Sequence, residues 1–154
     1  MAKPIVHARS SARRFGGVAE DYLEIHDLMD SSKSAFPDNR HRALTHNSWF
    51  FFIVERIFGH EINLSCVACA EDYDEDDCPL CEGTGKRGTA SVRAVCEQHV
   101  LEDFRGRFIP TVADYFEGME FQDWMNNGID GTPSSHRKID TLNKETKRRS
   151  VTLD

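Results

Sequence analysis

The sequence lacks any apolar run long enough to cross a bilayer. Its longest such run, Trp49 to Val54, has six residues, whereas a membrane-spanning helix needs about 20. The chain also lacks a positively charged leader followed by an apolar stretch and a small-residue cleavage site. We therefore expect a soluble intracellular protein with no membrane partner.

Basic residues are fewer than acidic residues: 19 Lys and Arg stand against 26 Asp and Glu, and the net charge is −7. This balance argues against a protein that simply coats nucleic acid. The charge is unevenly placed, because residues 71–77 hold six acids and residues 132–154 hold six Lys or Arg against three acids. Such a basic tail favours contact with phosphates or with an acidic partner surface, and the alternative is a solvated terminus.

Helical periodicity dominates the first half of the chain. Acids in a first turn and apolar residues at helical spacing predict a helix over about 19–33. Pro37 ends it, and Asp38 offers an N-cap to a long helix that runs to about Phe58, where Gly59 terminates it. The C-terminal half of this long helix is apolar nearly all round, so we expect it to be the central core helix.

The remaining elements are shorter. Residues 60–64 predict a short strand, about 94–104 a third helix and about 111–118 a final short helix, whereas residues 1–17 are expected to be a basic lead-in. We predict a compact, single-domain, mainly α body with a small β and zinc-knuckle insertion. Its expected parts are the N-terminal half of the helical body (1–64), the inserted zinc knuckle (65–91), the C-terminal half (92–127) and the basic tail (128–154).

Four of the five cysteines form a C-x2-C-x8-C-x2-C pattern: Cys66, Cys69, Cys78 and Cys81. Each CxxC turn presents two thiolates to one ion, and two such turns complete the tetrahedral shell of Zn²⁺. Four thiolates leave no position for water, so the expected zinc is one structural ion. The alternatives are disulfides, which an intracellular setting disfavours, and a redox CxxC, which normally stands alone at a helix start. The fifth cysteine, Cys96, is predicted to be a buried free thiol.

Histidine is abundant, with seven in the chain, and five of them lie in organised contexts. In the first predicted helix His26 and Asp30 share one stripe at i, i+4. In the third, His99 and Asp103 have the same relation, with Glu97 nearby. The candidate pocket residues are His7, His26, Asp30, His41, His46, Glu97 and His99.

The long predicted helix carries two further candidates. His46 lies on its apolar stripe and should point inward, whereas His41 lies about 140° away around a straight helix, so the two are not expected to chelate one ion. The functional interpretation is that several helices deliver histidines to a common pocket, which would hold a second divalent metal ion or perform general acid–base chemistry. The alternative is a polar core in which one carboxylate or carbonyl satisfies each histidine.

Six sequence blocks follow one another along the chain: HARSSARRFGG, DYLEIHDLMDSSK, DNRHRALTHN, ERIFG, VRAVCEQHVLEDF and IPTVADYF. In this order they resemble a small family of uncharacterised proteins from phages and bacteria, over about residues 6–58 and 92–116. Members of that family run more directly from the ERIFG block to the VR block, which implies that the cysteine segment is an insertion. The resemblance implies a phage-type accessory protein in the cytoplasm of a bacterial host cell.

Three hypotheses for function emerge. The first is an accessory or interaction protein, not an enzyme, that binds a larger protein or nucleoprotein assembly through its zinc-stabilised acidic knuckle and basic tail. The second is a metal-dependent hydrolase or nuclease that uses the His/Asp/Glu pocket. The third is a nucleic-acid-binding zinc module that uses Arg9, Arg13, Arg14 and the basic residues 137–149. Histidines that meet in one coordination sphere would favour the second, and histidines scattered over separate faces would exclude it.

Overall fold

The first helix of the fold occupies what the sequence predicted to be a basic lead-in. The computed structural model describes residues 3–71 and 78–117, all of them in the first of the two units into which the chain divides, after Glu117. Helix α1 (Pro4–Phe15) begins with proline in its first turn and ends at Gly16, whose φ of 92° suits glycine. The lead-in prediction was wrong because the buried side of α1 consists of His7, Ala8 and Ser11, which give no apolar signal.

The second helix confirms the prediction for residues 19–33. Helix α2 (Glu20–Asp30) continues into the 3-10 turn η1 (Ser31–Ser34), and it carries Glu20 and Asp21 in its first turn. Those acids complement the positive end of the helix dipole. Tyr22, Ile25 and Met29 are buried and place this side of α2 in the core.

The long helix predicted from Asp38 to Phe58 is broken, and that prediction was wrong. It consists of the 3-10 turn η2 (Asn39–His41), the short helix α3 (Arg42–Thr45) and helix α4 (Ser48–Phe58). Asn47 causes the break: its amide Nδ2 donates to the Ala43 carbonyl at 3.0 Å and its Oδ1 accepts from the Phe50 N–H at 3.1 Å. One side chain therefore ends α3 and caps the N-terminus of α4.

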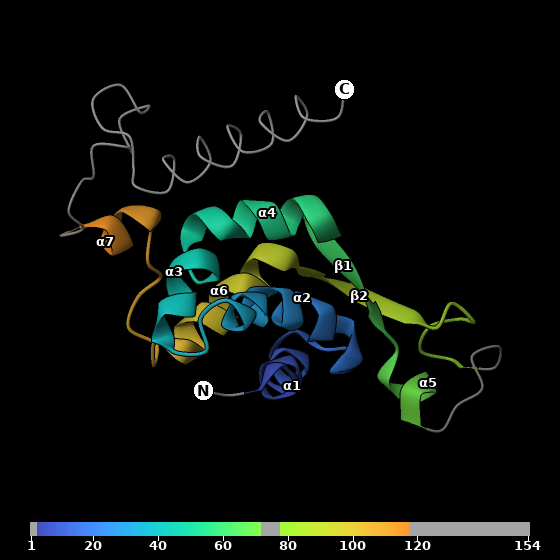
Figure 1. Cartoon of the computed structure of the whole chain (residues 1–154). Coiled ribbons are helices and arrows are strands. Elements are labelled where there is room, and N and C mark those ends of the chain that lie inside the picture. The colour runs from blue at the N-terminus through green and yellow to red at the C-terminus, as the bar shows by residue number, and fades with distance from the viewer. Residues whose placement is uncertain (1–2, 72–77, 118–154) are drawn as a thin grey trace, which may run out of the picture. The chain divides into compact units, whose positions relative to one another are not determined.

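Helix α4 is not the fully buried centre of the core that its composition predicted. Phe51 and Val54 are buried, but Trp49, Phe52 and Ile57 are more than half exposed. The core lies between α4, α2 and helix α6 (Val92–Asp103). Figure 1 shows α2 and α6 in the middle of the body, with α4 on one side and α1 on the other.

A hairpin carries the cysteine segment. Strand β1 (Glu61–Ser65) confirms the predicted strand and pairs antiparallel with β2 (Lys86–Ser91), and the short helix α5 (Val67–Glu71) follows β1. Asp21 of α2 anchors the hairpin, because its carboxylate accepts from the Ser65 N–H at 3.0 Å and from the Ser65 hydroxyl at 2.6 Å. The knuckle is thus held at one end of α2.

The C-terminal elements match their predictions. Helix α6 (Val92–Asp103) and the short helix α7 (Val112–Phe116) correspond to the helices predicted over 94–104 and 111–118, and the fold class is mainly α with one small sheet, as predicted. Cys96 is fully buried in the core. None of the helices in the described ranges is both long and apolar enough to cross a bilayer. The acidic run after Glu71 and the basic tail lie outside the described residues.

Replacing Asn47 by alanine should lower the free energy of unfolding by about 1–2 kcal/mol, because both the helix cap and the bond to Ala43 are lost. Urea denaturation followed by circular dichroism measures this change. The matched control is Asn63→Ala at an exposed position of β1, which should stay within about 0.5 kcal/mol of the parent. Equal effects of the two variants would contradict the role given to Asn47.

Candidate functional site

Five histidines meet inside the helical body. His26, His41, His46 and His99 are completely buried, and His7 is 3% exposed. They come from α1, α2, η2, the end of α3 and α6. Neighbouring rings lie within ring-contact distance, with centroids 4.2 to 5.7 Å apart. The histidines do not scatter to separate faces.

Two groups of side chains in this cluster have the geometry of metal ligands. The first is Asp30, His46 and His99, and the second is His41, His46 and Asp103; within each group the possible ligand atoms lie within 4.8 Å of one another. The prediction that His41 and His46 lie too far apart to share an ion assumed a straight helix, and the straight helix was wrong. The break after Thr45 places their rings edge to face with centroids 5.0 Å apart. We call these five residues the histidine–aspartate centre.

A chain of hydroxyl groups fixes the tautomer of His46. The Ser32 hydroxyl donates to the His41 carbonyl at 3.0 Å, so its oxygen accepts from the Thr45 hydroxyl at 2.8 Å. The Thr45 hydroxyl has only this one proton to donate, so its oxygen must accept the hydrogen bond from Nδ1–H of His46 at 3.0 Å. Nε2 of a neutral His46 therefore carries a lone pair.

A second chain fixes His26 and His99. The Gln98 amide donates to Glu102 at 2.7 Å, which turns its Oε1 toward Ser11, and the Ser11 hydroxyl donates to that oxygen at 3.1 Å. Ser11 must then accept from Nε2–H of His26 at 2.9 Å, and Nδ1 of His26 accepts from Nδ1–H of His99 at 2.8 Å. Nε2 of His99 is therefore also a lone pair.

The two lone pairs face each other across 3.1 Å, from Nε2 of His46 to Nε2 of His99. Asp30 Oδ1 lies 3.5 Å from the His99 nitrogen and 3.7 Å from the His46 nitrogen, and Asp103 Oδ2 lies 3.3 Å from the latter. No hydrogen-bond donor reaches Asp30 Oδ1 within the described ranges. Electron-rich atoms of Asp30 and His99 therefore lie beside the His46 nitrogen at short range, and a bound cation stabilises such an arrangement.

His41 offers a further ligand atom. Its Nδ1–H donates to the Asp38 carbonyl at 2.5 Å, so Nε2 holds the lone pair. That Nε2 is buried and has no hydrogen-bond partner in the part of the chain that the structure describes. A carbonyl behind the ring is the usual means of orienting a metal-binding histidine.

The protonation states suit metal binding. Burial lowers the pKa of His99 to about 4 and also lowers the pKa of His46. Burial alone would raise the pKa of Asp30, but the Lys33 ammonium, 2.5 Å from Oδ2, opposes burial and helps to lower this pKa. At neutral pH His46 and His99 are therefore neutral and the Asp30 carboxylate is charged, as metal ligands must be.

A cavity of about 470 Å³ adjoins the centre, and His7, Arg42, Glu102, Asp103 and Arg105 line it. Asp103 belongs to both the cavity wall and the centre. Nδ1–H of His7 donates to Glu102 at 2.7 Å. The His7 Nε2 atom lies 3.6 Å from Asp103 Oδ1 and has no hydrogen-bond partner among the described residues. His7 therefore presents a lone pair beside the centre.

The sequence named most of these residues but not all of them. His7, His26, Asp30, His41, His46 and His99 come together, whereas Glu97 is half-buried and belongs to neither metal-binding group found in the described ranges. Glu102, which orients His7, was missed. No local pattern indicates it, because the two residues are 95 positions apart in the sequence.

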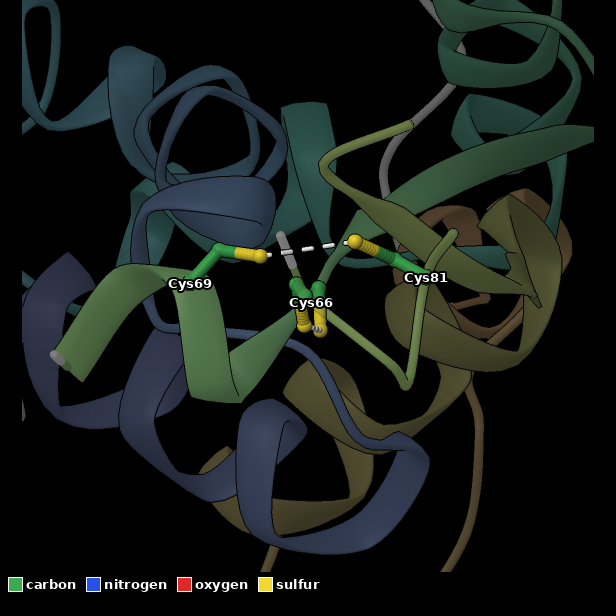
Figure 2. Close-up of side chains that lie close together, drawn as sticks. Cys66, Cys69 and Cys81 are labelled. Carbon is green, nitrogen blue, oxygen red and sulfur yellow. Dashed lines mark hydrogen bonds between the residues drawn. The ribbon is translucent and has the colours of Figure 1, made fainter. Parts of the chain in front are cut away.

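The four cysteines form a second, separate cluster. Cys69 belongs to α5, which lies at the end of the hairpin in Figure 1. The Sγ atoms of Cys69 and Cys81 are 3.4 Å apart and those of Cys66 and Cys78 are 3.9 Å apart, close to the ~3.8 Å edge of a tetrahedron with Zn–S bonds of about 2.3 Å. Figure 2 shows the sulfurs of Cys69 and Cys81 facing each other. The cluster is compatible with a zinc site, and no pair of these cysteines is disulfide-bonded.

Backbone groups support the thiolates. Backbone N–H groups of Cys69 and Ala68 lower the pKa of Cys66. The glycines after the second CxxC adopt positive φ, 77° at Gly83 and 63° at Gly85, and the Gly85 carbonyl accepts from the Cys66 N–H at 2.9 Å. The glycines thereby let the two halves of the knuckle approach each other closely.

Residues 2–71 and 81–125 match the family described as a domain of unknown function (DUF6915). The chain belongs to this family. The DUF6915 match includes every residue of the histidine–aspartate centre and leaves out residues 72–80, among them Cys78. This unmatched stretch lies inside the predicted insertion 65–91, whose boundaries stay a prediction. No curated protein and no solved structure matches the chain.

Replacing Cys66 by serine should abolish zinc binding at the knuckle, because three thiolates with a hydroxyl bind Zn²⁺ much more weakly than four. The zinc released per chain on denaturation measures this. Cys96→Ala is the control, since Cys96 lies in the core and not in the cluster, and it should keep its zinc. Retention of a full zinc equivalent at the knuckle by Cys66→Ser would contradict the assignment.

The buried histidines predict a steep acid dependence of stability. Burial lowers the pKa of His26 to about 2 and that of His99 to about 4, whereas an unfolded histidine titrates near 6.5. Between pH 6.5 and 4 only the unfolded chain takes up these two protons, so the free energy of unfolding should fall with decreasing pH, by about 3 kcal/mol per pH unit.

Denaturant unfolding at a series of pH values measures this slope. His26→Gln keeps a donor for Ser11 and removes one of the two titrations, so it should reduce the slope by about half. His60→Gln changes a histidine whose side chain is 88% exposed and should leave the slope unchanged. An unaltered slope in His26→Gln would show that the buried histidines do not govern it.

Proposed function

We propose that this member of the DUF6915 family is a metal-dependent hydrolase with one divalent ion bound at the histidine–aspartate centre. The proposal rests on one observation. Nε2 of His46 and Nε2 of His99 each carry a lone pair, and the two atoms face each other across 3.1 Å beside Asp30 Oδ1. Two neutral nitrogens and a carboxylate oxygen in a buried site repel one another unless a proton or a cation lies between them. The lowered pKa values of both histidines disfavour the proton.

The ligand geometry supports one ion and not two. Both metal-binding groups contain His46, and its Nδ1–H is engaged with Thr45. The remaining Nε2 has a single lone pair and can bind one ion only. The candidate ligands of that ion are His46 with members of the two groups, Asp30 and His99 in one and His41 and Asp103 in the other.

The donor set selects a transition metal. Imidazole nitrogens with carboxylate oxygens suit Zn²⁺, Mn²⁺, Fe²⁺ or Co²⁺, and sulfur is absent from this group of ligands. The cysteine knuckle, with four sulfurs, would hold the one structural Zn²⁺. The two clusters therefore do not compete for the same chemistry, and thiolates that stay reduced fit the cytoplasm.

The cavity supplies the rest of a hydrolytic site. A bound divalent ion polarises a substrate oxygen and lowers the pKa of water. His7 presents Nε2 at the cavity wall and has Glu102 behind its other nitrogen, 2.7 Å away. This carboxylate holds His7 in the tautomer that accepts a proton from water. Arg42 pairs with Asp103 at 3.2 Å and balances its charge.

Binding to a larger assembly remains a second proposal. Arg9 and Arg13 are exposed on one side of α1, away from the buried Ser11, and Arg14 is exposed near the C-terminus of the helix. Such exposed arginines are suited to phosphates or to an acidic protein surface. The basic residues 137–149 would add to this contact.

Metal content per chain tests the main proposal. The purified chain, supplied with Zn²⁺ and Mn²⁺, should bind two ions, one at each cluster. His99→Asn and Asp30→Asn should each lose the ion of the centre, with affinity reduced more than about 100-fold, and keep the knuckle zinc. Cys66→Ser should show the reverse pattern, and His60→Gln should keep both ions.

Thermal stability gives an independent measure. Mn²⁺ at about 100 times its dissociation constant from the centre should stabilise the parent chain by about 3 kcal/mol. It should have no effect of this kind on His99→Asn, because the four thiolates of the knuckle favour Zn²⁺. Hydrolysis of a panel of esters, amides and phosphate esters should depend on the same ion. A parent chain that binds one ion only, at the cysteines, would leave the histidines as a polar core and end the hydrolase proposal.

A further inference from the structure

The cavity beside the centre has a basic rim. Arg42 and Arg105 line the cavity of about 470 Å³, and Arg105 and Arg107 line an adjoining cavity of about 210 Å³. Asp103 is common to both cavities and to the centre. Neither Arg105 nor Arg107 forms an ion pair in the described part of the chain. These two arginines therefore lie beside the point where a substrate would meet the bound ion, in a wall that also contains Glu102 and Asp103.

Arg42 is held in place from two sides. Its Nε and Nη2 atoms donate to Asp103 Oδ2 at 3.3 and 3.2 Å, and its guanidinium lies over the Phe104 ring, 5.1 Å from the centroid. These two bonds use two of the five N–H donors of a guanidinium. The remaining donors have no acceptor within the described ranges. A fixed guanidinium with free donors loses little entropy when it binds an oxyanion.

Arg105 has an uncommon backbone conformation. Its φ is 57°, in the left-handed region, directly after the C-terminus of α6. The Gly106 N–H donates to the Leu101 carbonyl at 2.6 Å and closes this turn. Most helices use glycine in such a turn, because a side chain there costs about 1 kcal/mol. Arginine at this position therefore lowers the stability of the fold, and residues in such strained backbone conformations are typical of functional sites.

We infer that the substrate of this centre carries a phosphoryl group. A tetrahedral phosphate offers several charged oxygens, which suit both the guanidinium forks of Arg42 and Arg105 and a bound divalent ion. A cavity of about 470 Å³ also has room for an organic group attached to the phosphate. This inference rests on the proposed hydrolase function and specifies its substrate class as a phosphate ester.

The carboxylates in the same cavity wall make phosphate binding depend on the bound ion. Glu102 and Asp103 both line the cavity and would repel a phosphate. Asp103 is a ligand of the proposed ion and Glu102 accepts from His7, so the charge of the wall depends on whether the ion is bound. Phosphate should therefore bind to the metal-loaded chain and much more weakly to the metal-free centre.

The reaction is a hydrolysis without any change of oxidation state. A water oxygen forms a new bond to phosphorus, and the bond from phosphorus to the ester oxygen breaks. His7 accepts one proton of the water at Nε2. The departing alcohol oxygen takes up a proton from solvent water, and His7 returns its own proton to solvent. The products are the alcohol and a phosphate with one ester bond fewer.

Calorimetric titration of inorganic phosphate into the full chain tests the inference, with metal content measured on the same sample. The metal-loaded parent should bind phosphate at low ionic strength, and His99→Asn should not. Arg105→Gln should weaken binding about 10-fold, as expected for the loss of one charged hydrogen-bonding partner. Arg56→Gln removes the same charge from an exposed position of α4 and should change binding less than about 2-fold.

The variant Arg105→Gly distinguishes a loss of phosphate binding from a loss of folding. Glycine suits the left-handed conformation of residue 105, so this variant should melt at the same or a higher temperature and still lose about 10-fold in phosphate binding. An unchanged affinity in Arg105→Gly, or an equal loss in Arg56→Gln, would overturn the phosphoryl assignment.

The two proposals fail in different ways. A parent chain that holds an ion at the centre but does not bind phosphate, and that hydrolyses amides or carboxylic esters instead, overturns the substrate class and leaves the hydrolase intact. A parent chain with no ion at the centre overturns both.

Discussion

The contact between Nε2 of His46 and Nε2 of His99 is the constraint on which the rest of the body depends. Both Nε2 nitrogens carry lone pairs, because the ring proton of each histidine is on Nδ1. Nδ1–H of His46 donates to the Thr45 hydroxyl and Nδ1–H of His99 donates to His26, and the bonds behind these partners fix both directions. In a completely buried site this arrangement is unfavourable without a cation, because water is excluded and the interior dielectric is low. Binding of the proposed ion would therefore also stabilise the packing of α2 against α6.

Helix α2 links the two clusters. Its first turn carries Asp21, which fixes the hairpin through Ser65, and its last residue is Asp30, a member of the histidine–aspartate centre. The ligand chemistry keeps the clusters apart in function: soft sulfur at the hairpin suits a closed structural zinc, and nitrogen with oxygen suits an ion that also takes water or substrate. An ion of each kind would then order one end of the same helix.

Part of the site could be predicted because its signals are local. The CxxC pairs bring Cys66 near Cys69 and Cys78 near Cys81 by chain geometry alone, and His99 and Asp103 share a helix face through their i, i+4 spacing. The relation of His41 to His46 was predicted wrongly, because a pattern of apolar residues gives no sign of a helix break.

The sequence by itself determined the mainly α class, most helix positions and the cysteine cluster, since each depends on residues within about one helical turn or one knuckle. Tertiary structure alone decided that five histidines share one interior, that Glu102 orients His7 from 95 residues away, and that Asp103 joins the centre in place of Glu97. The reason is that the direction of a proton along a hydrogen-bond chain, and hence the position of a lone pair, depends on partners that only packing brings together.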